Sequence, residues 1–147
     1  MKTAYIVKAY RTAVGKAPKG VFRFKRPDEL AAETIEFMMN ELPDFDKTRI
    51  DDVMVGNAMP EAEQGLNVAR LISLMGLKIE DVPGVTVNRY CASGIETIGM
   101  ATAKIQSGMA HCIIAGGAES MSFIPMGGYK PTPDYAVAKA GNEDYYW

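Results

Sequence analysis

The sequence has little cysteine and histidine: Cys91 and Cys112 are the two cysteines among 147 residues, and there is one histidine. Two cysteines provide neither a disulfide framework nor the ligand spacing of a zinc site, and this usage is typical of a reducing cytosol. One histidine excludes a His-rich metal centre within this chain. No apolar run approaches the length that crosses a bilayer. We therefore expect a cytoplasmic protein without a bound metal and without a membrane span.

A strong net charge is also absent. The formal charge is −2, from 16 basic and 18 acidic residues, and 48% of the residues are hydrophobic. This balance is typical of a soluble globular protein, and it argues against a disordered chain or a nucleic-acid partner. A length of 147 residues is enough for one domain with its own core.

The basic residues are unevenly placed, because eight of the 16 precede Asp28, the first acidic residue. A basic, acid-free start can belong to a transit peptide, but residues 4–7 favour a strand. Gly15, Pro18 and Gly20 would also interrupt an amphipathic helix. Two interpretations stay open: a solvated loop, or a positive patch that attracts an anionic, phosphate-bearing substrate.

Apolar periodicity predicts strands that alternate with helices. The predicted strands cover residues 3–10, 52–56, 85–88 and 111–115. The predicted helices run from Pro27 until Pro43, from the residues after Gly65 to a C-cap at Gly76, and from the Cys91 junction to Gly108. This alternation predicts a layered α/β domain with a largely parallel sheet.

Each predicted helix has an apolar face that we expect to be buried. In the first helix this face comprises Leu30, Thr34, Phe37, Met38 and Leu42. In the second it comprises Val68, Leu71, Ile72 and Met75, and in the third Ile95, Ile98, Thr102 and Ile105. The third helix also carries many small residues, which imply close approach on several sides. We therefore expect that helix to be buried inside the domain.

One junction is suited to covalent chemistry. Cys91 lies where a β-branched strand ends and a helix begins. The first amides of a helix lack internal partners and carry partial positive charge, which favours a nucleophilic thiolate. Ala92, Ser93 and Gly94 leave room for a substrate carbonyl. A small buried structural cysteine would fit the same spacing, so spacing alone leaves both interpretations open.

Three strings of residues resemble the thiolase family, and they occur in the order found in that family. Asn88–Gly94 is similar to its active-cysteine signature, Asn-x-x-Cys-x-Ser-Gly. Ala115–Ser122 resembles its Gly-Gly-x-Glu-x-Met-Ser segment, and Arg11–Lys16 resembles its Arg-Thr-Pro-x-Gly-Lys segment, with Ala13 in place of the proline. Gly65–Arg70 resembles a further helix start, Gly-x-Asn-x-Ala-Arg, to which we assign packing and interface roles.

The resemblance implies a layered thiolase-like fold with a mostly parallel mixed sheet and a buried helix that carries the catalytic cysteine. Residues 1–122 are expected to form an incomplete amino-terminal α/β domain, and residues 123–147 to begin an inserted loop domain. A short helix is predicted over 134–140. Three consecutive aromatic residues, 145–147, make the sequence look truncated.

The same resemblance implies an acyltransferase that cleaves 3-ketoacyl-CoA with coenzyme A. Cys91 would attack the 3-keto carbon, release acetyl-CoA and keep the acyl group as a thioester, with its own N–H as one of two oxyanion donors. Coenzyme A would be a co-substrate rather than a tightly bound cofactor, and its binding residues stay unassigned. The expected partners are acyl-CoA substrates and further copies in a homodimer or homotetramer. In the family a base histidine and a second cysteine come later, so the isolated 147-residue chain is expected to be inactive.

Alternatives and neighbouring reactive residues complete the prediction. A ketosynthase-like condensing enzyme and a non-catalytic thiolase-fold assembly piece remain as other functions. His111 is expected at the end of its strand opposite to Cys91, which excludes it as the base. Cys112 is expected in the core, and Glu119 is expected to accept backbone amides and fix a turn.

Overall fold

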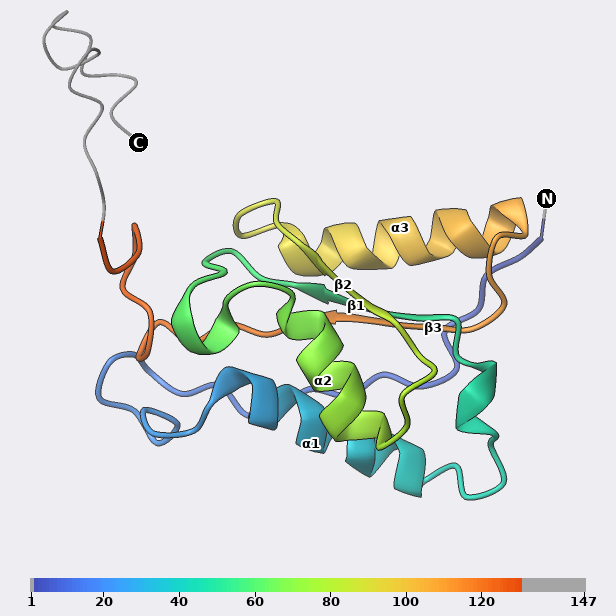
Figure 1. Ribbon diagram of the computed structural model, residues 1–147, viewed down its shortest axis with the longest axis horizontal. Coiled ribbons are helices and arrows are strands. Elements are labelled where there is room, and N and C mark those ends of the chain that lie inside the picture. The colour runs from blue at the N-terminus through green and yellow to red at the C-terminus, as the bar shows by residue number, and fades with distance from the viewer. Residues whose placement is uncertain (1, 131–147) are drawn as a thin grey trace, which may run out of the picture.

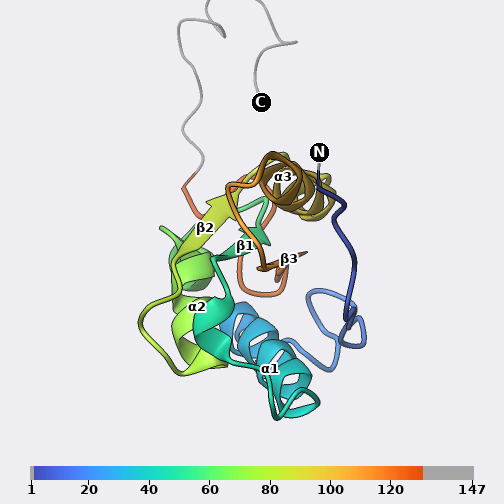
Figure 2. The same cartoon turned by 90° about the vertical axis from the view of Figure 1, so that its right-hand side faces the viewer.

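A computed structural model describes residues 2–130 as a three-layer α/β arrangement. The elements are α1 (Pro27–Asn40), η1 (Lys47–Arg49), β1 (Asp52–Gly56), η2 (Ala62–Gln64), α2 (Val68–Leu77), β2 (Gly84–Val87), α3 (Ser93–Ser107) and β3 (Ile113–Gly117). Helix α3 covers one face of the sheet, and α1 with α2 covers the other (Figure 1; Figure 2). This order confirms the predicted alternation from β1 onward.

The sheet of the described residues is entirely parallel, with strand order β2-β1-β3. Its central strand, β1, is buried throughout: Val53 and Met54 are 0% exposed and Val55 is 5% exposed. A strand covered on both faces reads as a continuous apolar run, as Val53–Val55 does. Because all three strands run the same way, the loops that follow them gather at one end of the sheet (Figure 1).

The first predicted strand, over 3–10, is wrong: residues 2–10 form neither helix nor strand, and Ile6 is 81% exposed. Strand β1 is paired on both edges, with β2 and β3, and residues 2–10 pair with none of these three strands. The segment is held by side chains instead, since Lys8 forms an ion pair of 3.2 Å with Glu41 beyond α1. The apolar residues of this segment therefore indicated a strand, but the segment joins no sheet among the described residues.

The predicted buried faces of the helices are also partly wrong. Phe37 of α1 is 55% exposed, Leu71 of α2 is 46% exposed and Ile95 of α3 is 69% exposed. Val68 and Ile72 of α2 are buried as predicted. The buried positions are Pro27, Asp28, Ala32, Ile35 and Met39 in α1, Val68, Ala69, Ile72, Ser73, Gly76 and Leu77 in α2, and Ser93, Thr97 and Ala101 in α3. Small residues such as Gly76 and Ala101 are among them because they allow backbones to approach closely. Helix α3 is thus buried along one side in this chain, rather than on several sides as expected.

Helix ends follow local backbone geometry. Gly108 ends α3 with a positive φ of 81°, which confirms the predicted C-cap. The C-cap of helix α2 is two residues later than predicted, at Lys78, which lies in the left-handed region at φ 59°. Gly76 serves packing instead, because a Cβ there would lie 2.9 Å from the Cβ of Ile35 in α1.

The turn into β3 depends on a carboxylate. Asp51 accepts the N–H of His111 at 2.6 Å and that of Cys112 at 3.0 Å. These two hydrogen bonds lower the pKa of the Asp51 carboxyl below its ordinary value of 3.8. The ionised side chain therefore fixes the start of β3, which begins at Ile113 rather than at His111 as predicted.

We expect Asp51→Ala to destabilise the chain by about 1 kcal/mol at neutral pH, the usual effect of removing a side-chain acceptor from exposed backbone amides. Because the folded-state pKa is depressed, this contribution is complete above about pH 5 and is lost as the pH falls below about 4. Urea unfolding of both proteins at neutral pH and at about pH 3 measures the effect. A difference in the free energy of unfolding that stayed the same at both pH values would contradict this role.

Beyond β3 the described residues form turns, and Ile124 is fully buried against the body of the domain. The helix predicted over 134–140 and the aromatic run 145–147 lie outside the described residues. No helix within 2–130 is both long and apolar enough to span a membrane.

Candidate functional site

Cys91 lies in the loop that joins β2 to α3, at the end of the sheet where the strands terminate (Figure 1). We call residues 88–92 the cysteine turn. The cysteine is exposed, and α3 begins two residues later at Ser93, with Ala92 as its N-cap. The predicted strand–cysteine–helix junction is therefore confirmed, with a short turn between the strand and the helix.

Hydrogen bonds hold the cysteine turn from within. Tyr90 has a positive φ of 49°, and its N–H donates to Asn88 Oδ1 at 2.9 Å. The Ser93 hydroxyl accepts the N–H of Arg89 at 2.8 Å and lies 2.6 Å from the carbonyl oxygen of Tyr90, to which it donates. Ser93 is 4% exposed, so these bonds are shielded from water. The backbone on both sides of Cys91 is thus fixed.

The start of α3 sits directly on the sheet. A Cβ at Gly56, the last residue of β1, would lie 2.4 Å from the carbonyl carbon of Ser93. One turn into the helix, the buried Thr97 hydroxyl lies 2.9 Å from the carbonyl oxygen of Gly116 in β3 and can donate to it. Only glycine at position 56 permits this approach, and the helix start is consequently fixed relative to both strands.

The N–H and the sulfur of Cys91 are available for new hydrogen bonds, as far as residues 2–130 are concerned. Neither its N–H nor its sulfur has a hydrogen-bond partner there. A free backbone N–H beside a nucleophile can donate to an oxygen that gains negative charge during attack. Arg89 of the cysteine turn forms an ion pair of 3.2 Å with Glu96 of α3.

A cluster of polar side chains joins the ends of β1 and β3. Glu119 accepts the N–H of Ala58 at 2.6 Å, the Asn57 side-chain amide at 3.3 Å and the Gln64 side-chain amide. Asn57 and Gln64 are 1% and 0% exposed. Gln64 also accepts the N–H of Ser120 at 3.0 Å. The prediction that Glu119 accepts a backbone amide and fixes a turn is confirmed.

The other predicted residues lie away from Cys91. Cys112 is half-buried beside Asp51, and burial raises the pKa of its thiol. His111 precedes β3, whereas Cys91 follows β2, and the parallel register places these positions at opposite ends of the sheet. His111 therefore does not meet Cys91, as the sequence predicted.

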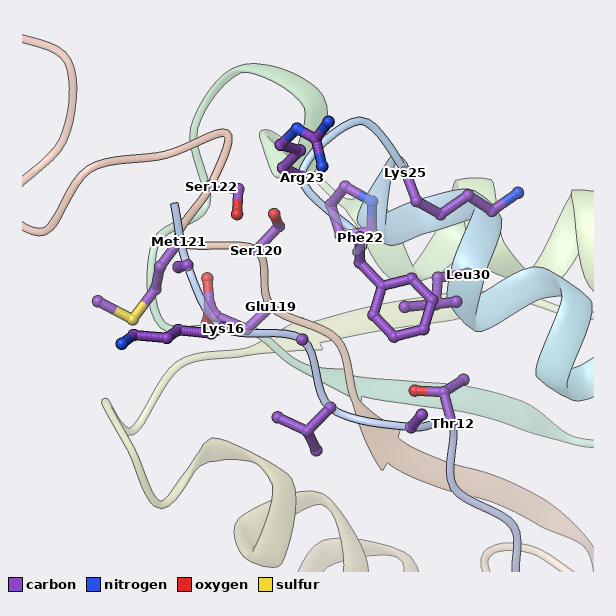
Figure 3. A pocket seen from close by; sticks show the side chains of 15 residues that line it. Thr12, Lys16, Phe22, Arg23, Lys25, Leu30, Glu119, Ser120, Met121 and Ser122 are labelled. Carbon is purple, nitrogen blue, oxygen red and sulfur yellow. The ribbon is translucent and has the colours of Figure 1, made fainter. Parts of the chain in front are cut away.

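A pocket of about 170 Å³ opens beside the cluster, between the loop before α1 and the segment after β3. Figure 3 shows the Phe22 ring beside Leu30 at one side of the pocket, whereas Lys16 lies next to Glu119 and Met121 in this view. Cys91 does not line it. The basic lining is consistent with either interpretation of the basic start, a solvated loop or an anion-attracting patch.

Sequence reasoning missed the residues that brace the site. The sequence indicates Ser93 only as a small residue beside Cys91, although a serine at the start of a helix commonly forms hydrogen bonds with nearby backbone groups. Asn57 directly follows β1, and a polar residue at the end of a buried parallel strand was the available signal. Gln64 gave no signal, because Glu119 and Ser120, the partners that join it to the site, lie more than fifty residues away in sequence.

Comparison with known proteins gives a consistent result. The family model described as "Thiolase, N-terminal domain" matches residues 4–145. A 3-ketoacyl-CoA thiolase of Bacillus subtilis (strain 168) is 46% identical over 145 residues, covering 99% of this chain and 37% of that protein. A beta-ketoadipyl-CoA thiolase of Acinetobacter baylyi is 44% identical over 126 residues, covering 85% of this chain and 31% of that protein. The chain therefore spans 37% or less of these curated relatives.

A solved structure agrees with the sequence matches. The crystal structure of the Bacillus anthracis acetyl-CoA acetyltransferase has a TM-score of 0.64 and 29% sequence identity, and the match covers 70% of this chain and 26% of that one. The three-layer arrangement of the described residues is thus shared with one part of a larger protein. The three sequence motifs and the comparisons indicate the same family.

Proposed function

Because the chain belongs to the thiolase family through an amino-terminal domain, we propose that it supplies the nucleophile of an enzyme that cleaves 3-ketoacyl-CoA with coenzyme A. The relatives support an enzyme of the thiolase class. A Cys91 thioester and the thiolytic direction of the reaction are our proposal. We also propose acyl-CoA substrates, coenzyme A as a co-substrate, and a homodimer or homotetramer in a reducing cytosol.

In the proposed reaction, the Cys91 thiolate attacks the 3-keto carbon and the carbonyl electron pair moves to oxygen. The oxyanion electron pair then re-forms the carbonyl as the bond between the keto carbon and C2 breaks. The electron pair of that bond passes to C2, which takes a proton from a general acid and leaves as acetyl-CoA. A second coenzyme A gives its thiol proton to a base and attacks the thioester carbonyl. The shortened acyl-CoA forms and the Cys91 thiolate is restored.

This chain contributes the nucleophile and one donor. The observation that carries the proposal is an exposed cysteine whose N–H has no hydrogen-bond partner among residues 2–130, in a turn fixed between a buried sheet and the start of a helix. A rigid N–H stabilises the oxyanion without reorganising during the reaction. The base and the second donor are assigned to the part of the full-length protein that this chain does not span. The isolated chain is accordingly expected to give no turnover, since a missing base alone costs a factor of about 10²–10⁴.

The test is to trap the acyl intermediate. The full-length protein is mixed with acetyl-CoA, quenched in acid and digested, and the Cys91 peptide is expected to carry one acetyl group. Acetyl-CoA should also protect Cys91 from iodoacetamide, which otherwise alkylates Cys91 well before the half-buried Cys112. Thiolysis with the acetyl group on another residue would refute the assignment. Equal alkylation of both cysteines would favour the non-catalytic assembly piece.

A further inference from the structure

We propose that Glu119 is a positioning residue for Cys91, and that it acts on the cysteine turn through Ala58 and Asn88. The catalytic consequence of this role rests on the proposed function, whereas the structural link does not. Glu119 and Cys91 follow different strands, β3 and β2, and the link between them passes through the loop after β1.

Three hydrogen bonds form the link. The Glu119 carboxylate accepts the N–H of Ala58 at 2.6 Å. The carbonyl oxygen of Ala58 accepts the side-chain amide of Asn88 at 3.0 Å. Asn88 Oδ1 in turn accepts the N–H of Tyr90 at 2.9 Å, and Tyr90 is bonded to Cys91. Ala58 is thus held on one side by Glu119, and on the other side it holds the residue that shapes the turn.

The carboxylate is itself firmly placed. Its second oxygen accepts the side-chain amides of Asn57 and Gln64, which are almost completely buried. Asn57 also donates to the carbonyl oxygen of Ala118 at 2.8 Å, and Gln64 donates to that of Met59 at 2.8 Å. Bonds to a charged acceptor are stronger than bonds between neutral groups. The Glu119 carboxylate is therefore held more rigidly than a carboxylate without these bonds would be.

Tyr90 explains why the turn needs an anchor. Its positive φ of 49° is uncommon for an aromatic residue, and such a backbone persists when its surroundings hold it. Asn88 supplies the acceptor for the Tyr90 N–H, but Asn88 is exposed and depends on Ala58 for its own position. Without Glu119, the Ala58 N–H loses its acceptor, and Ala58 then holds the Asn88 side chain less firmly.

The charge of Glu119 and its position predict opposite effects on Cys91. A carboxylate that acted only by its charge would disfavour a thiolate at Cys91, so that its removal would speed alkylation. A carboxylate that acts through the link keeps the thiol at the start of α3, so that its removal slows alkylation. The direction of the change therefore separates the two roles.

The first experiment measures the rate of Cys91 alkylation by iodoacetamide in the 147-residue chain. We expect Glu119→Ala and Asn88→Ala each to slow it about two- to tenfold, the effect of one net hydrogen bond. The double variant should be no slower than the slower single variant, because both changes break one link. Glu61→Ala is the matched control, since Glu61 accepts the N–H of Tyr129 near the same end of the sheet and has no bond to the link. Cys112 reports unfolding in the same digest, and its rate should stay constant.

Glu119→Gln keeps the test readable if the alanine variant does not fold. Its amide oxygen can still accept the Ala58 N–H, so we expect partial recovery of the Cys91 rate, whereas a purely electrostatic role predicts equal rates for Gln and Ala. An unchanged or faster rate in the Glu119 variants overturns the proposal. The proposal is also overturned if the double variant slows alkylation by the product of the two single-variant factors, because the two residues would then act independently.

The second experiment measures thiolysis by the full-length protein. A positioning role predicts that Glu119→Gln lowers kcat about 10- to 100-fold with KM nearly unchanged, because misplaced reacting groups affect the transition state. An unchanged kcat overturns the catalytic part of the proposal. If the parent protein forms no acyl-cysteine while the alkylation order holds, the proposed function fails and the structural link stands.

Discussion

Replacing Cys91 with alanine is expected to abolish acyl transfer by the full-length protein while leaving the fold intact. Covalent catalysis depends wholly on the sulfur, and loss of a nucleophile typically lowers kcat by about 10⁴-fold or more. The side chain is exposed and makes no hydrogen bond within the described residues, so alanine removes little packing. Steady-state thiolysis of acetoacetyl-CoA and thermal unfolding of both proteins measure the two effects.

Cys112→Ala is the matched control for this result. Cys112 packs beside the hydrophobic core at the start of β3, and its replacement should cost about 1 kcal/mol of stability with little loss of activity. Substantial thiolysis by a folded Cys91→Ala protein would remove Cys91 from the mechanism. A large loss of activity in a folded Cys112→Ala protein would mean that Cys112, and not Cys91, is the nucleophile.

Gly56→Ala is expected to destabilise the chain strongly, although it adds a single methyl group. The new Cβ would lie 2.4 Å from the carbonyl carbon of Ser93 and 2.6 Å from the amide nitrogen of Gly94. Backbone atoms cannot turn aside as a side chain can, so α3 must shift away from the sheet. We expect a loss of about 3 kcal/mol, at the upper end of overpacking effects, and a fall in Tm of roughly 6–12 °C. Thermal unfolding followed by circular dichroism gives both values.

Gly99→Ala tests the same addition at a site with room for it. Gly99 lies within α3, and nothing comes within 4 Å of the position of its Cβ. Alanine in a helix interior is favoured over glycine by about 0.5–1 kcal/mol, so this variant should be more stable than the parent chain. Destabilisation by Gly99→Ala and not by Gly56→Ala would mean that α3 rests on the sheet by a different face.

The sequence was sufficient to predict where most elements lie, but not which side of each helix is buried. Apolar spacing located α1, α2 and α3, yet Phe37 and Ile95 are exposed. Periodicity ranks side chains by hydrophobicity, whereas close packing on a sheet or a neighbouring helix selects small ones such as Thr97 and Gly76. The prediction for residues 3–10 is wrong for a different reason: strand formation depends on pairing with segments distant in sequence, which an apolar run does not reveal.

The candidate site was predictable only where its contacts are local. Cys91 is identified by its neighbours in the chain, and Asn88 accepts the N–H of Tyr90, only two residues away. Glu119 could be assigned to a turn because it follows two glycines. Its bonds to Asn57 and Gln64 join segments that only the parallel sheet brings together, so the sequence contains no periodic signal for them.

The all-parallel sheet also sets an order of assembly. Strand β1 meets β2 after one crossover through α2, but it meets β3 only after α2, β2 and α3 have been made. Pairing across a longer loop costs more entropy and is slower, so we expect β3 to join last. Gly116 and Glu119, which hold the start of α3 and the link to the cysteine turn, arrive with that strand. The reactive cysteine therefore acquires its environment in the final step of folding, after the core beneath it has formed.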